Sequence, residues 1–260
     1  MPLSGRYRAV VFDMDGLLLD TETLWHEAEA ELFRRHGAEF THADQLRVIG
    51  TSFDVSARYF AERLGWPMER RMELVQESTA LMHERVRDQV KARPGAVELI
   101  EGLRRLSGVG LGLASNSPRY LVDDALATAG LADAFDAIVT ADDVAHPKPA
   151  PDIYRLACER LGVEPSEALA LEDSASGVIA AKAAGLTCIA VPMFAETDVS
   201  AADRVIGSLE DLLDENAEAS MDRRAVSCWA CAEASRPCGP ARCRPVTTRS
   251  APPRCNTCAR

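Results

Sequence analysis

Short apolar runs alternate with amphipathic segments in the second half of the chain, and this alternation constrains the fold more than any other feature. The candidate strands are residues 110–115, 136–141, 168–173 and 187–191. Apolar residues at helical spacing predict helices at 118–130, 151–162 and 175–185. Strands and helices in alternation predict an α/β fold, with a parallel sheet covered on both faces. Residues 7–13 add a buried central strand that ends in acidic residues.

The stretch from Asp20 to Val90 has a different character. Three segments combine helical spacing with dense charge, at residues 21–37, 54–65 and 68–90. No good strand interrupts them, so we expect an all-helical cap at 20–90 inserted into a core formed by 1–19 and 91–216.

The C-terminal tail, residues 217–260, holds six of the eight cysteines. They are Cys228, Cys231, Cys238, Cys243, Cys255 and Cys258. The tail lacks hydrophobic periodicity and is rich in Arg, Pro, Ala and Ser, a composition that predicts disorder. A frameshifted or read-through end would look the same. Two Cys-x-x-Cys pairs leave a zinc-binding appendix as the alternative.

Composition narrows the class of protein. Hydrophobic residues make up 47% of the chain, enough for a sizeable core. No apolar run approaches the roughly 18–20 residues that span a bilayer, and the N-terminus has no secretory pattern. We therefore expect a cytoplasmic protein without a membrane partner. The net charge of −11 also argues against nucleic acid as a partner.

Asp13 and Asp15 close the first predicted strand and are separated by one residue. Residues i and i+2 of a strand point the same way, so both carboxylates can face one cleft. Two like charges there need a cation or a shared proton. Mg²⁺ suits the pair when a phosphate supplies further oxygen ligands, although a solvated turn is the ordinary alternative.

Three further polar clusters stand at or beside predicted strand ends. Ser115 and Asn116 precede a helix whose N-terminal N–H groups can hold an anion. Lys148 is fixed between two prolines in a loop, which suits a positive charge that meets a phosphate. Glu172 and Asp173 can complete the oxygen shell of a metal. Each cluster alone is more often structural; together they indicate a catalytic site.

With these motifs in place, the chain resembles the haloacid dehalogenase superfamily of phosphotransferases, in the branch with a helical cap after the first strand. The motifs that carry the resemblance are DMDGLLLDTE, LASNS, the lysine of HPKPAPD, and LEDSASGV. The resemblance covers roughly Tyr7 to Leu213 and is strongest to sugar-phosphate phosphatases and β-phosphoglucomutase-like proteins. It implies a Rossmann-like core.

The resemblance also implies roles for individual residues. Asp13 would be the nucleophile that forms an aspartyl-phosphate, and Asp15 the general acid and then the base. Ser115, Asn116 and Lys148 would bind the phosphoryl group. Mg²⁺ would be held by Asp13, Asp15 through its main-chain carbonyl, Glu172 and Asp173.

Residues of the predicted cap distinguish a phosphatase from a mutase, which moves a phosphoryl group within one sugar. Mutases of this branch typically carry a histidine after the first motif and two basic residues around the first cap glycine. This chain has Trp25, Ile49 and Phe53 at those places. We therefore expect a phosphatase, with a mutase as the alternative and a non-enzymatic interaction protein as a remote one.

The remaining expectations concern the substrate and the assembly. The predicted pocket residues are Glu22, Trp25, His26, Phe53 and Arg119. We expect a small phosphorylated metabolite as the partner, such as a sugar or polyol phosphate, and a monomeric protein. The sequence does not distinguish a hexose phosphate from a deoxyhexose phosphate, a polyol phosphate or phosphoglycolate.

Overall fold

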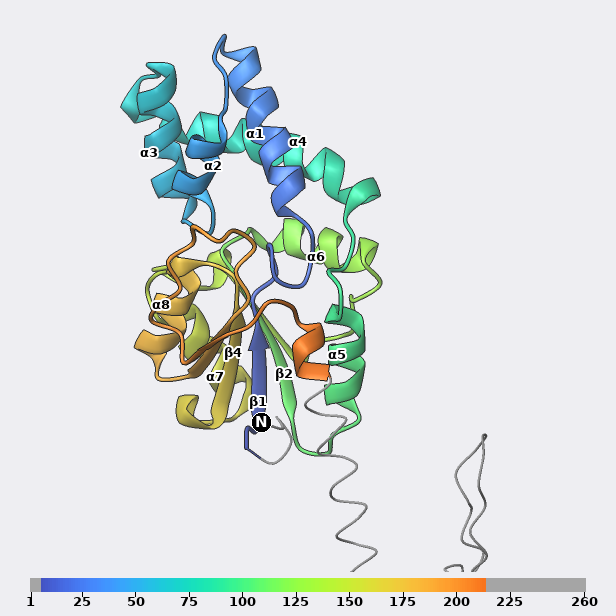
Figure 1. Ribbon diagram of the computed structural model, residues 1–260. Helices are drawn as coiled ribbons and strands as arrows, with labels where there is room; N and C mark the ends of the chain where they lie inside the picture. The colour runs from blue at the N-terminus through green and yellow to red at the C-terminus, as the bar shows by residue number, and fades with distance from the viewer. Residues whose placement is uncertain (1–5, 214–260) are drawn as a thin grey trace, which may run out of the picture. The chain divides into compact units, whose positions relative to one another are not determined.

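A computed structural model of the chain describes residues 6–213, and six of its strands form one parallel sheet (Figure 1). In chain order the strands are β1 Ala9–Phe12, β2 Gly110–Ser115, β3 Ala137–Thr140, β4 Ala168–Glu172, β5 Thr187–Ala190 and β6 Arg204–Val205. Their spatial order is β3-β2-β1-β4-β5-β6. The predicted parallel α/β fold is therefore confirmed, and only the short edge strand β6 was not predicted.

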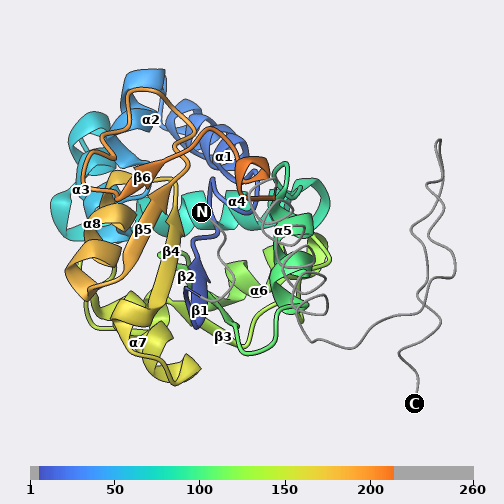
Figure 2. The same cartoon turned by 60° about the horizontal axis from the view of Figure 1, so that its bottom comes forward.

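Side chains of β1 alternate between two apolar clusters on opposite faces of the sheet. Val10 and Phe12 belong to the cluster that includes helices α5 (Ala96–Arg104) and α6 (Arg119–Thr128). Ala9 and Val11 belong to the cluster that includes α7 (Asp152–Leu161) and α8 (Ala175–Ala184). Figure 2 shows these two pairs of helices on either side of the strands. A strand that is apolar on both faces has to be covered twice, which explains the layered arrangement.

Four of the α-helices between β1 and β2 lie above the carboxyl ends of the strands in Figure 1. They are α1 Glu22–Arg35, α2 His42–Val48, α3 Phe53–Leu64 and α4 Arg71–Gln89. Helices α1 and α3 both pack on α4, and Phe33 and Phe60 meet edge to face with their ring centroids 5.5 Å apart. The predicted helical insertion is confirmed, and α2 is a short helix that the sequence did not predict separately.

The chain leaves and rejoins the sheet region at adjacent points. The main-chain N–H of Asp20 donates to the carbonyl of Lys91, at 2.9 Å, and that of Arg93 donates to Leu18, at 2.8 Å. The division into core and cap at residues 20 and 90 agrees with this junction and stays a prediction. The predictions about residues 217–260 fall outside the described residues. No helix among residues 6–213 is long and apolar enough to cross a bilayer.

Candidate active site

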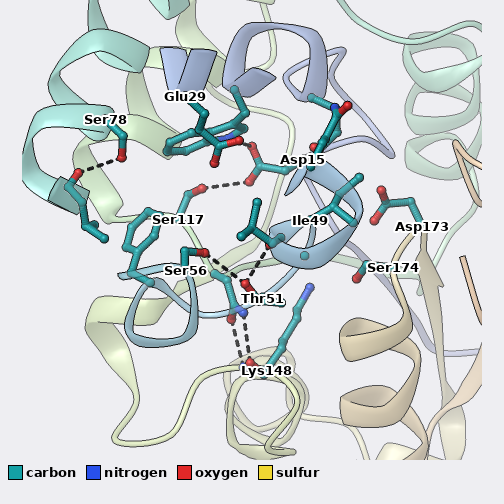
Figure 3. Close-up of a pocket in the computed structure, with 18 of the residues that line it drawn as sticks. Asp15, Glu29, Ile49, Thr51, Ser56, Ser78, Ser117, Lys148, Asp173 and Ser174 are labelled. Atoms are coloured by element: carbon teal, nitrogen blue, oxygen red, sulfur yellow. Dashed lines mark hydrogen bonds between the residues drawn. The ribbon is translucent and has the colours of Figure 1, made fainter. Parts of the chain in front are cut away.

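The polar residues predicted at the strand ends converge on one pocket. Asp13 and Asp15 follow β1, Asn116 follows β2 and Asp173 follows β4, and all of them line the pocket together with Lys148. The strand order reverses direction at β1, and ligands of open α/β sheets bind at such switch points. The pocket encloses about 730 Å³, including the part open to solvent, and side chains of the helical insertion form its opposite wall (Figure 3).

Lys148 links two carboxylates beneath the pocket. Its ammonium group lies 2.6 Å from Asp13 Oδ1 and 2.6 Å from Glu172 Oε1, and it donates to the carbonyl of Ala114 at 2.8 Å. Only 2% of Lys148 is exposed. Burial alone would lower the pKa of Lys148, but the charges of Asp13 and Glu172 hold it above its usual value. Lys148 therefore stays charged and orients Asp13.

Glu172 is fully buried and saturated with donors. Its Oε1 accepts from Lys148 and, at 2.5 Å, from the hydroxyl of Tyr154, while its Oε2 accepts from the hydroxyl of Ser174 at 3.2 Å. Burial, followed by the charge of Glu172, raises the pKa of Tyr154, which keeps this phenol a donor. A Cβ on Gly177 would lie 2.0 Å from the Glu172 carboxylate, so only glycine fits there.

Asp15 is held by three side-chain donors from different elements. The hydroxyls of Ser115 and Ser117 donate to its Oδ2 at 3.0 and 2.9 Å. The indole N–H of Trp25, on α1, donates to its Oδ1 at 3.3 Å. The insertion and the sheet thus fix the orientation of Asp15 together.

Three buried carboxylates fit a hard divalent cation. Ligand oxygens of Asp13, Glu172 and Asp173 all lie within 4.8 Å of one another. The Oδ2 atom of Asp13 is buried without a hydrogen-bond partner, and no such bond among the described residues involves the Asp173 side chain. Burial, and then the charge of Glu172, raises the pKa of Asp173. The oxygens without a partner, on Asp13 and Asp173, are the kind of donor that Mg²⁺ prefers, whereas both oxygens of Glu172 already accept hydrogen bonds.

The glycine after Asp15 is also required by this cluster. Gly16 has φ +80°, and a Cβ there would lie 2.3 Å from Asp173 Oδ2. A side chain at this position would both strain the backbone and displace a candidate ligand.

The predicted phosphate-binding residues have additional partners. Asn116 donates to the main-chain carbonyl of Lys148 at 3.1 Å and accepts from the Lys148 N–H at 2.9 Å, so its amide fixes the lysine loop. Ser115 is fully buried, donates to Asp15 and accepts from the Ser117 N–H at 3.0 Å. Their contacts with phosphate stay predictions.

Of the five predicted pocket residues, three line the pocket and two do not. The three that line the pocket are Glu22, Trp25 and Phe53. His26 is not among the lining residues and packs instead on Phe40, at 5.6 Å between ring centroids. Arg119 is exposed and pairs with Asp123 at 2.8 Å. The structure therefore brings neither His26 nor Arg119 to the site.

Several residues of the site escaped the sequence analysis. They are Glu29, Gln45, Ser78, Ser117 and Tyr154. A signal existed for Glu29, because it shares the helical stripe of Glu22, Trp25 and Leu32, where an acid interrupts the buried face of α1. Tyr154 reaches Glu172 only through the packing of α7, which leaves no local pattern in the sequence.

Known proteins match both the sequence and the fold. A family model of haloacid dehalogenase-like hydrolases matches residues 7–185. YhcW of Bacillus subtilis (strain 168) is 41% identical over 189 residues, covering 71% of this chain and 83% of that protein. Hexitol phosphatase B of Escherichia coli (strain K12) is 35% identical over 185 residues, with coverage of 71% and 83%.

Solved structures extend the match. CbbY from Rhodobacter sphaeroides in complex with phosphate superposes with a TM-score of 0.70 at 30% identity, covering 79% of this chain and 96% of that one. β-Phosphoglucomutase from Clostridium difficile shares the fold at 22% identity, with a TM-score of 0.70 and coverage of 85% and 99%. The motifs, the sheet order and the family match agree: this chain is a hydrolase and belongs to the haloacid dehalogenase-like family.

Proposed function

We propose that the chain is a Mg²⁺-dependent phosphatase that hydrolyses a small phosphate monoester of the sugar or polyol class through an aspartyl-phosphate. The observation that carries the proposal is the hydrogen bonding of the two Asp13 carboxylate oxygens. One of these oxygens is bound by the buried Lys148, and the other has no hydrogen-bond partner. The resemblance to hexitol phosphatase B supports the substrate class.

The first half-reaction transfers the phosphoryl group to the protein. A carboxylate oxygen of Asp13 forms a bond to phosphorus while the bond from phosphorus to the leaving alcohol oxygen breaks. Asp15, held by Ser115, Ser117 and Trp25, donates a proton to that departing oxygen. The alcohol then leaves.

The second half-reaction returns the protein to its starting state. Asp15 takes a proton from a water molecule as the water oxygen bonds to phosphorus. The bond between phosphorus and Asp13 breaks, and inorganic phosphate is released. Asp15 is again protonated for the next turnover, so protons balance over the cycle.

The cluster at the strand ends would hold the metal. The ligands would be Asp13, Asp173 and the main-chain carbonyl of Asp15, with Glu172 beside them. A bound Mg²⁺ supplies neutralisation of the charge on the phosphoryl oxygens. Lys148 already touches Asp13 and lies at the pocket, where it can contact the same oxygens.

A sugar-phosphate mutase is the second candidate, and the wall of the pocket argues against it. A mutase has to hold a second phosphate on the cap. Ile49 and Phe53 line the pocket where basic residues would be expected, and Lys148 is the only cationic residue among the described ones that line it. Incubation with β-glucose 1-phosphate separates the two: a phosphatase releases phosphate, whereas faster accumulation of glucose 6-phosphate would favour the mutase.

Hydrolysis of p-nitrophenyl phosphate with Mg²⁺ tests the proposed function. We expect Asp13→Asn to lower kcat at least about a thousand-fold, because the nucleophile is lost. Asp88→Asn, an exposed position on α4, is the matched control and should keep full activity. Activity that survives Asp13→Asn would refute the mechanism.

We further propose that the protein acts as a monomer in the cytoplasm.

A further inference from the structure

Two polar side chains of the helical insertion face the pocket without a partner. Glu29, on α1, is 7% exposed, and Gln45, on α2, is 8% exposed. Both line the pocket. No side-chain hydrogen bond or ion pair among the described residues involves either of them. Among the described residues, neither Glu29 nor Gln45 has a fully enclosed polar atom that lacks a partner, so their polar atoms are open to the pocket. Since buried polar side chains are usually hydrogen-bonded, two unpartnered ones on this wall point to a ligand that pairs with them.

The rest of this wall mixes hydroxyl and apolar groups. The Ser78 hydroxyl is bonded to the Val75 carbonyl at 3.0 Å, and the Ser56 hydroxyl to that of Thr51 at 3.0 Å. Figure 3 draws Glu29 and Ser78 at the end of the pocket away from Lys148. A substrate whose phosphate meets Asp13 and Lys148 therefore extends its other end toward Glu29.

The charge of the pocket selects against a second anion. Its lining carboxylates are Asp13, Asp15, Glu22, Glu29 and Asp173. Lys148 is already paired with Asp13 and Glu172. A carboxylate or second phosphate near Glu29 would have no free cation to pair with, because Lys148 is the only cationic residue among the described ones that line the pocket.

Glu29 and Gln45 match hydroxyl groups chemically. Burial raises the pKa of Glu29 to about 8, so near neutral pH this carboxyl keeps its proton and can both donate and accept. The amide of Gln45 also donates and accepts. Hydroxyl groups do both as well, and they satisfy such a pair without carrying a charge into the pocket.

We propose that Glu29 and Gln45 form a subsite that binds uncharged hydroxyl groups at the end of the substrate remote from its phosphate. The inference rests on the proposed phosphatase function and narrows its substrates to polyhydroxylated monophosphates. Phosphoglycolate and sugar bisphosphates are disfavoured, because each carries a second anion. Glu29 and Gln45 are specificity-determining residues, whereas the phosphoryl chemistry is carried out by Asp13 and Asp15.

A matched pair of substrates tests the subsite in the full-length protein with Mg²⁺. Glucitol 6-phosphate and hexyl phosphate have the same chain length and differ in their hydroxyl groups. We expect Glu29→Leu to lower the ratio of kcat/KM for glucitol 6-phosphate to kcat/KM for hexyl phosphate at least about tenfold. A site built for hydroxyls discriminates between substrates through its polar groups. Glu29→Gln keeps a donor and an acceptor and should keep the ratio within about threefold. Turnover of p-nitrophenyl phosphate, which has no hydroxyl groups on its ring, is measured in both variants to show that Asp13-dependent hydrolysis persists.

The control variant is Glu62→Leu, at an exposed position on α3, which should leave the ratio unchanged. An unchanged ratio in Glu29→Leu, or an equal loss on both substrates, would overturn the subsite even while Asp13-dependent hydrolysis of p-nitrophenyl phosphate persists. Failure of that hydrolysis in the unmodified protein would instead remove the proposed function. A preference of at least about tenfold for 6-aminohexyl phosphate over glucitol 6-phosphate would also overturn the proposal, because it would assign Glu29 to a cation.

Discussion

At the scale of single residues, the orientation of the proposed acid/base is the feature that the structure explains best. Asp15 receives one hydroxyl donor from the end of β2, one from the loop that follows it and one indole donor from α1. An acid that must give its proton to a departing alcohol has to be held within hydrogen-bond reach of it. Trp25 is therefore a positioning residue, and it connects the insertion directly to the chemistry.

Trp25→Phe tests this positioning. The change keeps the aromatic contact with Phe53, whose ring centroid lies 5.9 Å from that of Trp25, and removes only the N–H. The indole N–H stabilises the negative charge that Asp15 acquires as it gives up its proton. A hydrogen bond to a charged group is worth about 1.5–3 kcal/mol, so kcat for an alkyl phosphate should fall by about 10- to 150-fold. p-Nitrophenyl phosphate has a good leaving group and should lose less than about threefold. Trp66→Phe, outside the pocket, is the control, and equal losses on both substrates would contradict the assignment.

Glu29 predicts a pH dependence of stability. Burial raises its pKa from 4.5 to about 8, so the folded state keeps a proton that the unfolded state releases. The free energy of unfolding therefore falls as pH rises from about 5 to 8. Glu29→Gln removes this pH-dependent fall in the free energy of unfolding, because glutamine does not ionise. The Tm advantage of Glu29→Gln over the unmodified protein should grow across that range, as thermal unfolding in matched buffers can show. A difference that stays constant with pH would contradict a protonated Glu29.

At the scale of elements, the start of α8 supports the floor of the site. Ser174 caps this helix by accepting from the Gly177 N–H at 3.1 Å and donates to Glu172 at the same time. The close approach of the first turn to Glu172 leaves no room for a side chain at Gly177. The helix and the buried carboxylate thus constrain each other.

Two glycine substitutions separate this packing effect from helix propensity. Gly177→Ala places a methyl group 2.0 Å from Glu172, and it should lower the free energy of unfolding by about 1–3 kcal/mol and also reduce kcat. Gly102→Ala, inside α5, meets no atom within 4 Å and should stabilise the protein by about 0.5–1 kcal/mol. Denaturant unfolding measures both. Stabilisation by Gly177→Ala would contradict this prediction, because it would show that α8 accommodates the added methyl group beside Glu172 without loss of stability.

At the scale of the whole molecule, the sheet and the strand-end residues could be predicted because they follow local rules. The apolar run before Asp13 and Asp15 predicts a buried strand, and the two acids predict a polar site at its end. The residues of the insertion were harder, because a helix turns about 100° per residue and only packing decides which side faces inward. Trp25 and His26 are neighbours in the chain, yet only Trp25 lines the pocket. Glu29 was not predicted, although it shares the buried stripe of α1 with Glu22 and Leu32.

The candidate metal cluster predicts a change in stability when the metal is removed. Mg²⁺ that binds only the folded protein stabilises it, by about 2.7 kcal/mol at a hundredfold excess over Kd. EDTA should therefore lower the Tm of the unmodified protein, and added Mg²⁺ should restore it. Asp173→Asn removes a ligand and should make the Tm insensitive to both. The same Mg²⁺ response in the two proteins would place the ion elsewhere.

The central claim is that Asp13 carries the phosphoryl group during turnover. The most direct measurement is mass spectrometry of acid-quenched protein after mixing with p-nitrophenyl phosphate and Mg²⁺. Asp15→Asn should be used beside the unmodified protein, because loss of the base slows the hydrolysis of the intermediate. We predict one phosphoryl group on the peptide that contains Asp13, enriched in Asp15→Asn and absent in Asp13→Asn. A phosphoryl group on another residue, or turnover by Asp13→Asn without any modified peptide, would contradict the account.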